Sequence, residues 1–81
     1  MKTQLIYLGR EITLKTLEKT VAEHGLGNTN KIVLNPQNFN SIALEHTQTY
    51  EEMLPMPFTV HGVEVEKDSS KEIPYGTLGI T

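Results

Sequence analysis

The spacing of apolar residues changes several times along this chain, and each change marks the boundary of an expected element. Residues 5–8 and 32–34 are runs of β-prone apolar residues, so they predict strands. Residues 58–66 show interrupted alternation, which is typical of two strands joined by a turn. Leu78 and Ile80 alternate with small residues and predict a last short strand. Between these stretches the period becomes helical.

Residues 32–36 end a strand and begin a helix within a few positions. Ile32, Val33 and Leu34 are consecutive apolar residues, as in a strand buried on both faces. Asn35 can cap a helix with its side-chain oxygen. Pro36 suits the first helical position, where its missing N–H needs no partner.

The first helix is predicted over Thr13–His24. Leu14, Leu17 and Val21 recur at helical spacing, with charged residues on the other faces. Thr13 is a suitable N-cap, and Gly25 lies where a left-handed residue commonly ends a helix.

The second helix is predicted to begin at Pro36 and to end before Pro55. One stripe of it is expected to face the core: Phe39, Ile42, Ala43, His46 and Tyr50. The opposite positions are expected to face water: Asn38, Ser41, Glu45 and Gln48. Thr47–Thr49 are mediocre helix formers, so we expect the helix to weaken there.

Apolar positions change phase across His61-Gly62, and a two-residue hairpin turn explains this shift. The turn would pair Val60 with Val63, and likewise Phe58 with Val65, so that all four point inward. Gly62 supplies the positive φ that such a turn requires. A bulge at Gly62 within one long strand is the alternative.

Together these elements predict one α+β domain over residues 1–81, in the order β-α-β-α-β-β-β. We expect a mixed sheet of about five strands with two helices packed on it. The first two strands flank a helix, so we expect them to be parallel, with a right-handed crossover between them. Residues 67–72 are expected to form a polar loop and Pro74–Gly76 a turn.

The amino-acid composition argues against several classes of function. The 81 residues allow only a small core, so self-association or a partner surface would help stability. Lys and Arg total 7 against 10 acidic residues, and they are scattered, which argues against nucleic acid as a partner. There is no cysteine, and no apolar run approaches the roughly 20 residues of a membrane span. We therefore expect a soluble, non-secreted protein without a membrane partner.

Catalytic, cofactor and metal sites are all predicted to be absent. His24, His46 and His61 form no tight pair, and no acidic residue completes a ligand set at useful spacing. His46 is expected at the edge of the core with a hydrogen bond. The serines lack a nucleophile motif, and the paired carboxylates at Glu51-Glu52 and in the hairpin are expected to be solvated.

The surface is therefore the expected place of function. Residues 53–57 combine two methionines, a leucine and two prolines without regular pattern, which suits either a cover for the core or an interface. The predicted partner-binding residues lie in this segment and in the hairpin: Met53, Leu54, Met56, His61, Glu64 and Glu66.

A set of short motifs resembles the C-terminal part of the tailed-bacteriophage major capsid protein family. The motifs are an apolar strand ending in Asn35-Pro36, a helix, the strand-Gly-strand element around Gly62, and Ile73–Thr77 before the last strand. The resemblance covers about residues 16–80. Capsid proteins are several times longer, with a long helix and an extended loop that this chain lacks.

The resemblance implies a non-enzymatic phage or prophage protein that acts by protein–protein contact. Its role would be that of a virion component or an assembly factor, with itself or another phage protein as the partner. The resemblance thus implies a location in the host cytoplasm or in the virion. A small inhibitor that binds a host protein through the hairpin edge or residues 53–57 is the alternative. A small metal or nucleotide enzyme ranks third.

Overall fold

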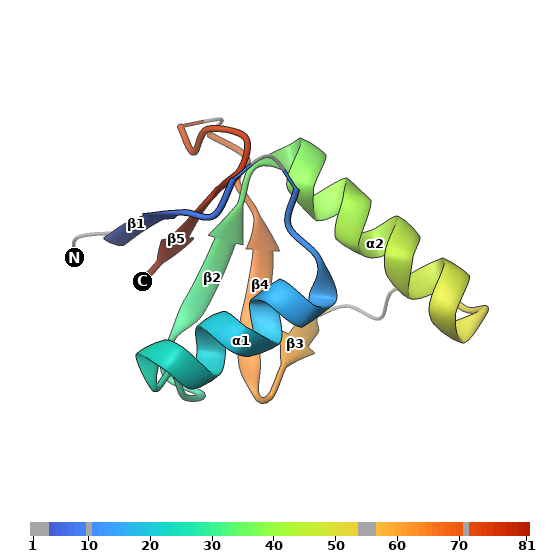
Figure 1. Cartoon of the computed structure of the whole chain (residues 1–81), viewed down its shortest axis with the longest axis horizontal. Coiled ribbons are helices and arrows are strands. Elements are labelled where there is room, and N and C mark those ends of the chain that lie inside the picture. Colours follow the sequence, from blue (N-terminus) through green and yellow to red (C-terminus); the bar gives the residue numbers. More distant parts are fainter. Residues whose placement is uncertain (1–3, 10, 54–56, 71) are drawn as a thin grey trace.

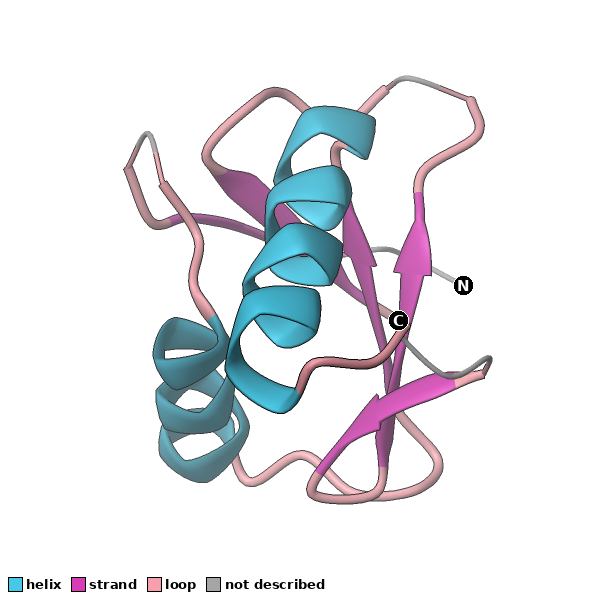
Figure 2. Ribbon diagram, turned by 90° about the vertical axis from the view of Figure 1, so that its right-hand side faces the viewer, coloured by secondary structure: helices cyan, strands magenta, loops and turns pink. Residues whose placement is uncertain are grey.

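The chain forms a five-stranded mixed sheet with two helices packed on one face, as the computed structural model shows (Figures 1 and 2). The structure describes residues 4–9, 11–53, 57–70 and 72–81. The helices are α1 (Leu14–His24) and α2 (Pro36–Tyr50). The strands are β1 (Gln4–Tyr7), β2 (Lys31–Leu34), β3 (Phe58–Val60), β4 (Val63–Lys67) and β5 (Thr77–Ile80). The predicted α+β class and the order of elements are confirmed.

The strands lie in the order β1-β5-β2-β4-β3. β5 is antiparallel to both β1 and β2, β2 is parallel to β4, and β4 is antiparallel to β3. β1 and β2 therefore point the same way, but they are not neighbours, because β5 lies between them. The expected parallel orientation of the first two strands is confirmed, although the two strands do not pair with each other. The parallel neighbours are β2 and β4.

The inner residues of β2, β3, β4 and β5 form the core together with the buried sides of the two helices, and Ile6 of β1 packs against this cluster. The core includes Ile32, Leu34, Val63, Val65 and Leu78 from the sheet, and Leu17, Val21, Phe39 and Ile42 from the helices. Ile12 is also fully buried, although it precedes α1 in an irregular segment. Ile12 belongs to the core cluster, but the spacing of apolar residues could not predict this, because Ile12 lies in no helix or strand.

The helix ends follow the predicted capping chemistry. The N–H of Thr16 donates to Thr13 Oγ1, and Gly25 ends α1 with a φ of 58°. The N–H of Gln37 donates to Asn35 Oδ1 at the start of α2. α2 continues through Thr47–Thr49 to Tyr50. Tyr50 was expected on the stripe that faces the core but is 59% exposed, because the last turn of α2 extends beyond the core.

The hairpin has the predicted register. Val60 pairs with Val63, and Phe58 with Val65. His61 and Gly62 have φ values of 50° and 83°, which suit a two-residue turn with two left-handed positions. The alternative of one long bulged strand is thereby excluded.

Replacing Gly62 with alanine should destabilise the domain by about 1–2 kcal/mol, because an L-residue resists this left-handed conformation. A Cβ at Gly62 would meet no atom within 4 Å, so the cost is conformational alone. Gly27 is a matched control, since a Cβ there also meets nothing within 4 Å and its φ is not positive. Urea unfolding of Gly62→Ala and Gly27→Ala measures the difference. Equal stabilities would contradict the turn geometry.

Residues 68–70 and 72–76 are anchored by buried polar groups rather than being simply a solvated loop. Asp68 is buried, and its carboxylate accepts hydrogen bonds from the Ser70 side chain and from the N–H of Ile73. Asn35 Nδ2 donates to the Ile73 carbonyl at 2.9 Å. These residues are therefore fixed against the start of α2.

Two α2 residues predicted to face water are engaged instead. Asn38 is fully buried, and its Oδ1 accepts the N–H of Gly76 at 2.8 Å. Glu45 is half-buried, and its Oε1 accepts the N–H of Leu14 at the start of α1. Both predictions were wrong because helical spacing cannot show where distant segments return to the helix.

Acid should weaken the fold partly through Asp68. The Ser70 side chain and the Ile73 N–H hold the pKa of its carboxyl below the usual value, which is about 3.9. The unfolded chain therefore takes up this proton more readily than the folded chain. The resulting stability is fully present above about pH 4 and is lost as pH falls through the lowered folded pKa.

An Asp68→Asn variant should accordingly show a smaller acid-side loss of unfolding free energy than the parent chain. Urea unfolding between pH 2 and pH 6 measures this slope. Glu23→Gln removes a carboxylate at an exposed position and serves as the control. An unchanged slope in Asp68→Asn would contradict the assignment.

Candidate functional site

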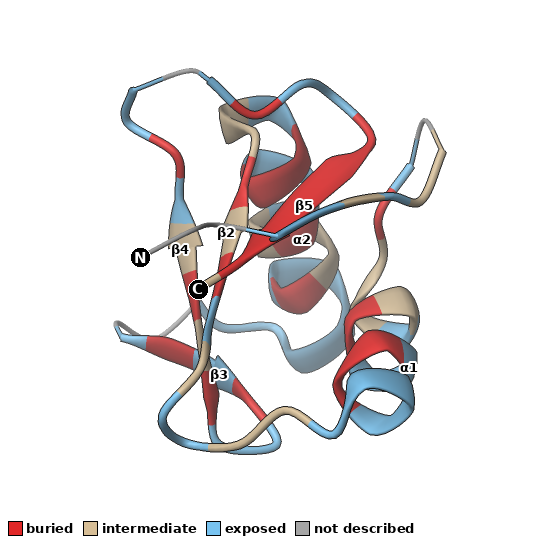
Figure 3. Ribbon diagram, turned by 90° about the vertical axis from the view of Figure 1, so that its left-hand side faces the viewer, coloured by how far each residue is buried: buried red, intermediate tan, exposed pale blue. Residues whose placement is uncertain are grey.

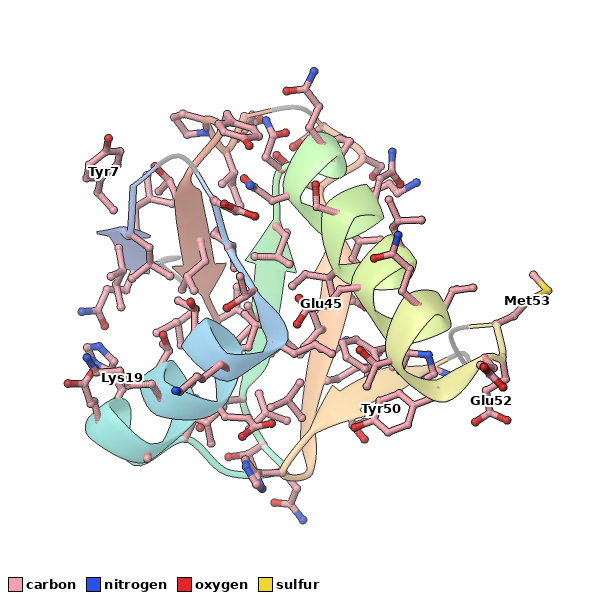
Figure 4. All side chains as sticks on the ribbon, turned by 45° about the vertical axis from the view of Figure 1, so that its right-hand side comes forward. Tyr7, Lys19, Glu45, Tyr50, Glu52 and Met53 are labelled. Carbon is pink, nitrogen blue, oxygen red and sulfur yellow. The ribbon has the colours of Figure 1, made fainter. Side chains whose placement is uncertain are left out.

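The predicted partner-binding residues do not gather in one place. Met53 follows the end of α2 and is 86% exposed, pointing away from the domain (Figure 4). His61 lies in the hairpin turn. Glu64 and Glu66 lie on β4 and are half-buried. Leu54 and Met56 lie outside the described residues. The assignment of these residues to a partner stays a prediction, and those that are described occupy separate parts of the surface.

One face of the sheet carries no helix in the described part of the chain. We call it the open face (Figure 3). The register and the alternation along each strand define its residues: Leu5, Tyr7, Lys31, Val33, Thr59, Glu64, Glu66, Thr77 and Gly79. The sequence predicted that the outward side of the hairpin faces solvent. It did not show that this side belongs to the same sheet face as Leu5 and Tyr7 of β1.

The β1 side of the open face is apolar. Leu5 is 55% exposed and Tyr7 is 74% exposed. Gly79 lies between Leu5 and Val33 in the register, and without a side chain it leaves a depression between them. A cavity of about 320 Å³ lies here, bordered also by Ile73 and by the acidic residues Asp68 and Glu72.

The β4 side of the open face is charged. Lys31 Nζ lies 3.5 Å from Glu66 Oε1, and both side chains are about half exposed. Lys31 is also opposite Glu64 in the register, so Glu64 and Glu66 lie on the same face as this one basic residue. A pair at this exposure contributes little stability. Because two acidic residues, Glu64 and Glu66, lie on this side of the open face with one basic residue, Lys31, this side is acidic.

A second cavity, of about 290 Å³, lies where the hairpin meets the two helices. His46 is only 9% exposed there, and its ring lies 4.7 Å from the Tyr50 ring and 6.3 Å from the Phe58 ring, centre to centre. At the rim, His61 Nε2 lies 4.0 Å from Glu18 Oε1, with both side chains well exposed. We call this the hairpin pocket.

The hairpin pocket brings together two of the three histidines, which the sequence search for tight pairs had missed. His46 lies on the inner stripe as predicted, but its Nδ1 is buried without a hydrogen-bond partner. Within residues 4–9, 11–53, 57–70 and 72–81, no three metal-ligating side chains of His, Cys, Asp or Glu lie close enough to hold a metal ion. The interior of the pocket is therefore aromatic and apolar, and its rim carries the side chains of His61 and Glu18.

No helix in the described part of the chain is both long and apolar enough to cross a membrane. Comparison of the chain with protein-family models, with curated proteins and with solved structures found no match.

Proposed function

We propose that this chain is a non-enzymatic phage or prophage protein that acts by contact with other proteins, either as a capsid-related virion component or as an assembly factor. The observation that carries the proposal is the open face. A two-layer domain commonly leaves one sheet face in water, but such a face is then mainly polar. Here Leu5 and Tyr7 expose large side chains on it, which is typical of an interaction surface.

The elements that carry the capsid resemblance support the proposal. The strand before Asn35-Pro36, the hairpin around Gly62 and the turn at Pro74–Gly76 all form where the motifs predicted them. They lie in one layer of the molecule, as parts of the same sheet or directly beside it.

The test is to induce the phage that encodes the chain, separate its particles and their precursors on a density gradient, and quantify the chain by mass spectrometry. We expect it to be enriched with the particles or the precursors, relative to a soluble host enzyme measured in the same fractions. Recovery only in the soluble fraction would overturn the proposal, and recovery there bound to a host protein would favour the inhibitor alternative.

A paired substitution tests the role of the open face. Glu64→Arg reverses a charge on this face, and Glu23→Arg makes the same change at an exposed position on α1. We expect Glu64→Arg to lower incorporation by about tenfold, which corresponds to about 1.4 kcal/mol of binding free energy. Glu23→Arg should incorporate normally. Equal incorporation of the two variants would contradict a role for this face.

A further inference from the structure

The two edges of the sheet differ in their protection against pairing with another strand. β3 has only three residues, begins directly after Pro57 and ends in the hairpin turn. Short length and a flanking proline are common protections of an edge strand. β1 has four residues, Gln4–Tyr7, and lacks the other protections: it contains no proline and no charged residue, and it pairs with β5 without a bulge.

The hydrogen-bond pattern shows which groups of β1 face the free edge. The N–H of Leu8 donates to the Gly76 carbonyl at 2.8 Å, and this pair continues the β1–β5 register. In an antiparallel ladder, bonded pairs alternate with non-bonded pairs. Gln4 and Ile6 are therefore bonded to β5, while Leu5 and Tyr7 direct their N–H and C=O groups away from it.

A second copy of β1 can satisfy these groups in one symmetric register. If Leu5 lies opposite Tyr7 of the partner, the two-fold axis passes between the two copies of Ile6. Leu5 and Tyr7 of both copies then exchange four backbone hydrogen bonds. Because opposite residues share a face, Leu5 of each copy packs beside the partner's Tyr7 on the open face. This arrangement brings the two exposed apolar side chains of β1 into lateral contact with those of the partner.

We propose that β1 pairs antiparallel with β1 of a second copy, which joins the two sheets into one continuous sheet. Charge favours the same chain as the occupant. The chain carries a net charge of −3, but Gln4–Tyr7 is uncharged, so two identical strands meet without like-charge repulsion. This dimer does not depend on the proposed phage role, and the two are tested by different measurements.

Sedimentation equilibrium of the full chain over a range of concentrations tests the association. We expect a monomer–dimer equilibrium. Leu5→Pro removes an edge-facing N–H but none that bonds to β5, and Tyr7→Lys adds a charge at the strand junction. Each should raise the dissociation constant by at least about tenfold. Thr59→Lys adds the same charge at the opposite edge and should leave the dissociation constant unchanged.

The register has its own test, because the chain contains no cysteine. Ile6→Cys places two thiols opposite each other at a non-hydrogen-bonded pair, where the Cα atoms are about 4.5 Å apart and a disulfide can form. Gln4→Cys is the control, since the two copies of residue 4 are not opposite in this register. Mild oxidation should yield covalent dimer from Ile6→Cys and not from Gln4→Cys.

Circular dichroism of each variant confirms that it is folded, and Tyr7→Lys carries the test if Leu5→Pro does not fold. A parent chain that stays monomeric throughout would overturn the proposal. A dimer that survives both edge substitutions, or that is lost in Thr59→Lys instead, would overturn it as well.

Discussion

Replacing Val63 with aspartate should abolish the folded state at 25 °C. Val63 is fully buried, pairs with Val60 across the hairpin and belongs to the main core cluster. An ionised carboxylate without a partner in such a place costs several kcal/mol. Domains of ordinary size are stable by only about 5–15 kcal/mol, and one this small lies near the lower limit.

Far-UV circular dichroism and thermal melting measure the outcome for Val63→Asp. Thr59→Asp is the matched control, because it introduces the same group on the same hairpin at an exposed position. The control should melt close to the parent chain. If Val63→Asp also melted like the parent chain, the inward orientation of this hairpin would be wrong.

Asn38→Ala should lower the free energy of unfolding by about 2–3 kcal/mol. The substitution removes the acceptor of the Gly76 N–H, and a buried donor without a partner costs about 1–3 kcal/mol. Loss of the packed side chain adds to this cost, because Asn38 is fully buried.

Asn40→Ala is the control for this second substitution, since Asn40 is exposed two positions further along the same helix. It should be neutral or slightly stabilising, because alanine is the better helix former. Urea unfolding compares the two variants, and amide hydrogen exchange should show faster exchange of Gly76 in Asn38→Ala alone. Similar effects at both positions would contradict the hydrogen bond.

Local rules were sufficient for the elements whose chemistry is contained in a few neighbouring residues. Thr13 and Gly25 bound α1, Asn35 caps α2, and the phase change at His61-Gly62 fixes the hairpin. Each of these features depends on backbone conformation and hydrogen bonds within about four positions, so the sequence displays them directly.

Features that depend on the return of a distant segment were not predictable in this way. Three such features join residues that are more than 25 positions apart. They are the insertion of β5 between β1 and β2, the hydrogen bond between buried Asn38 and Gly76, and the contact of Glu45 with α1. Helical spacing gives the direction of a side chain relative to its own helix. It does not show what covers that side.

For the candidate surfaces, too, the sequence indicated single residues but not which residues lie together. Glu64 and His61 were singled out from composition within the hairpin, yet the structure places them with different neighbours. Glu64 lies beside Lys31 on the open face, whereas His61 lies beside Glu18 at the hairpin pocket. The exposed side of β1 was missed because residues 5–8 look like an ordinary apolar strand. Only the sheet order shows that this strand is an edge.

The central position of β5 has a consequence for biosynthesis. Residues 77–80 are the last of the five strands to leave the ribosome, yet they hold β1 to the remainder of the sheet. Until then β1 has no neighbour among the described strands, and one side of β2 is unpaired. The pairing of Gln4 with Ile80 joins residues from nearly opposite ends of the described chain, and such long-range contacts slow folding. The nascent polypeptide therefore passes through a stage with exposed backbone edges, when aggregation or a chaperone competes with completion of the sheet.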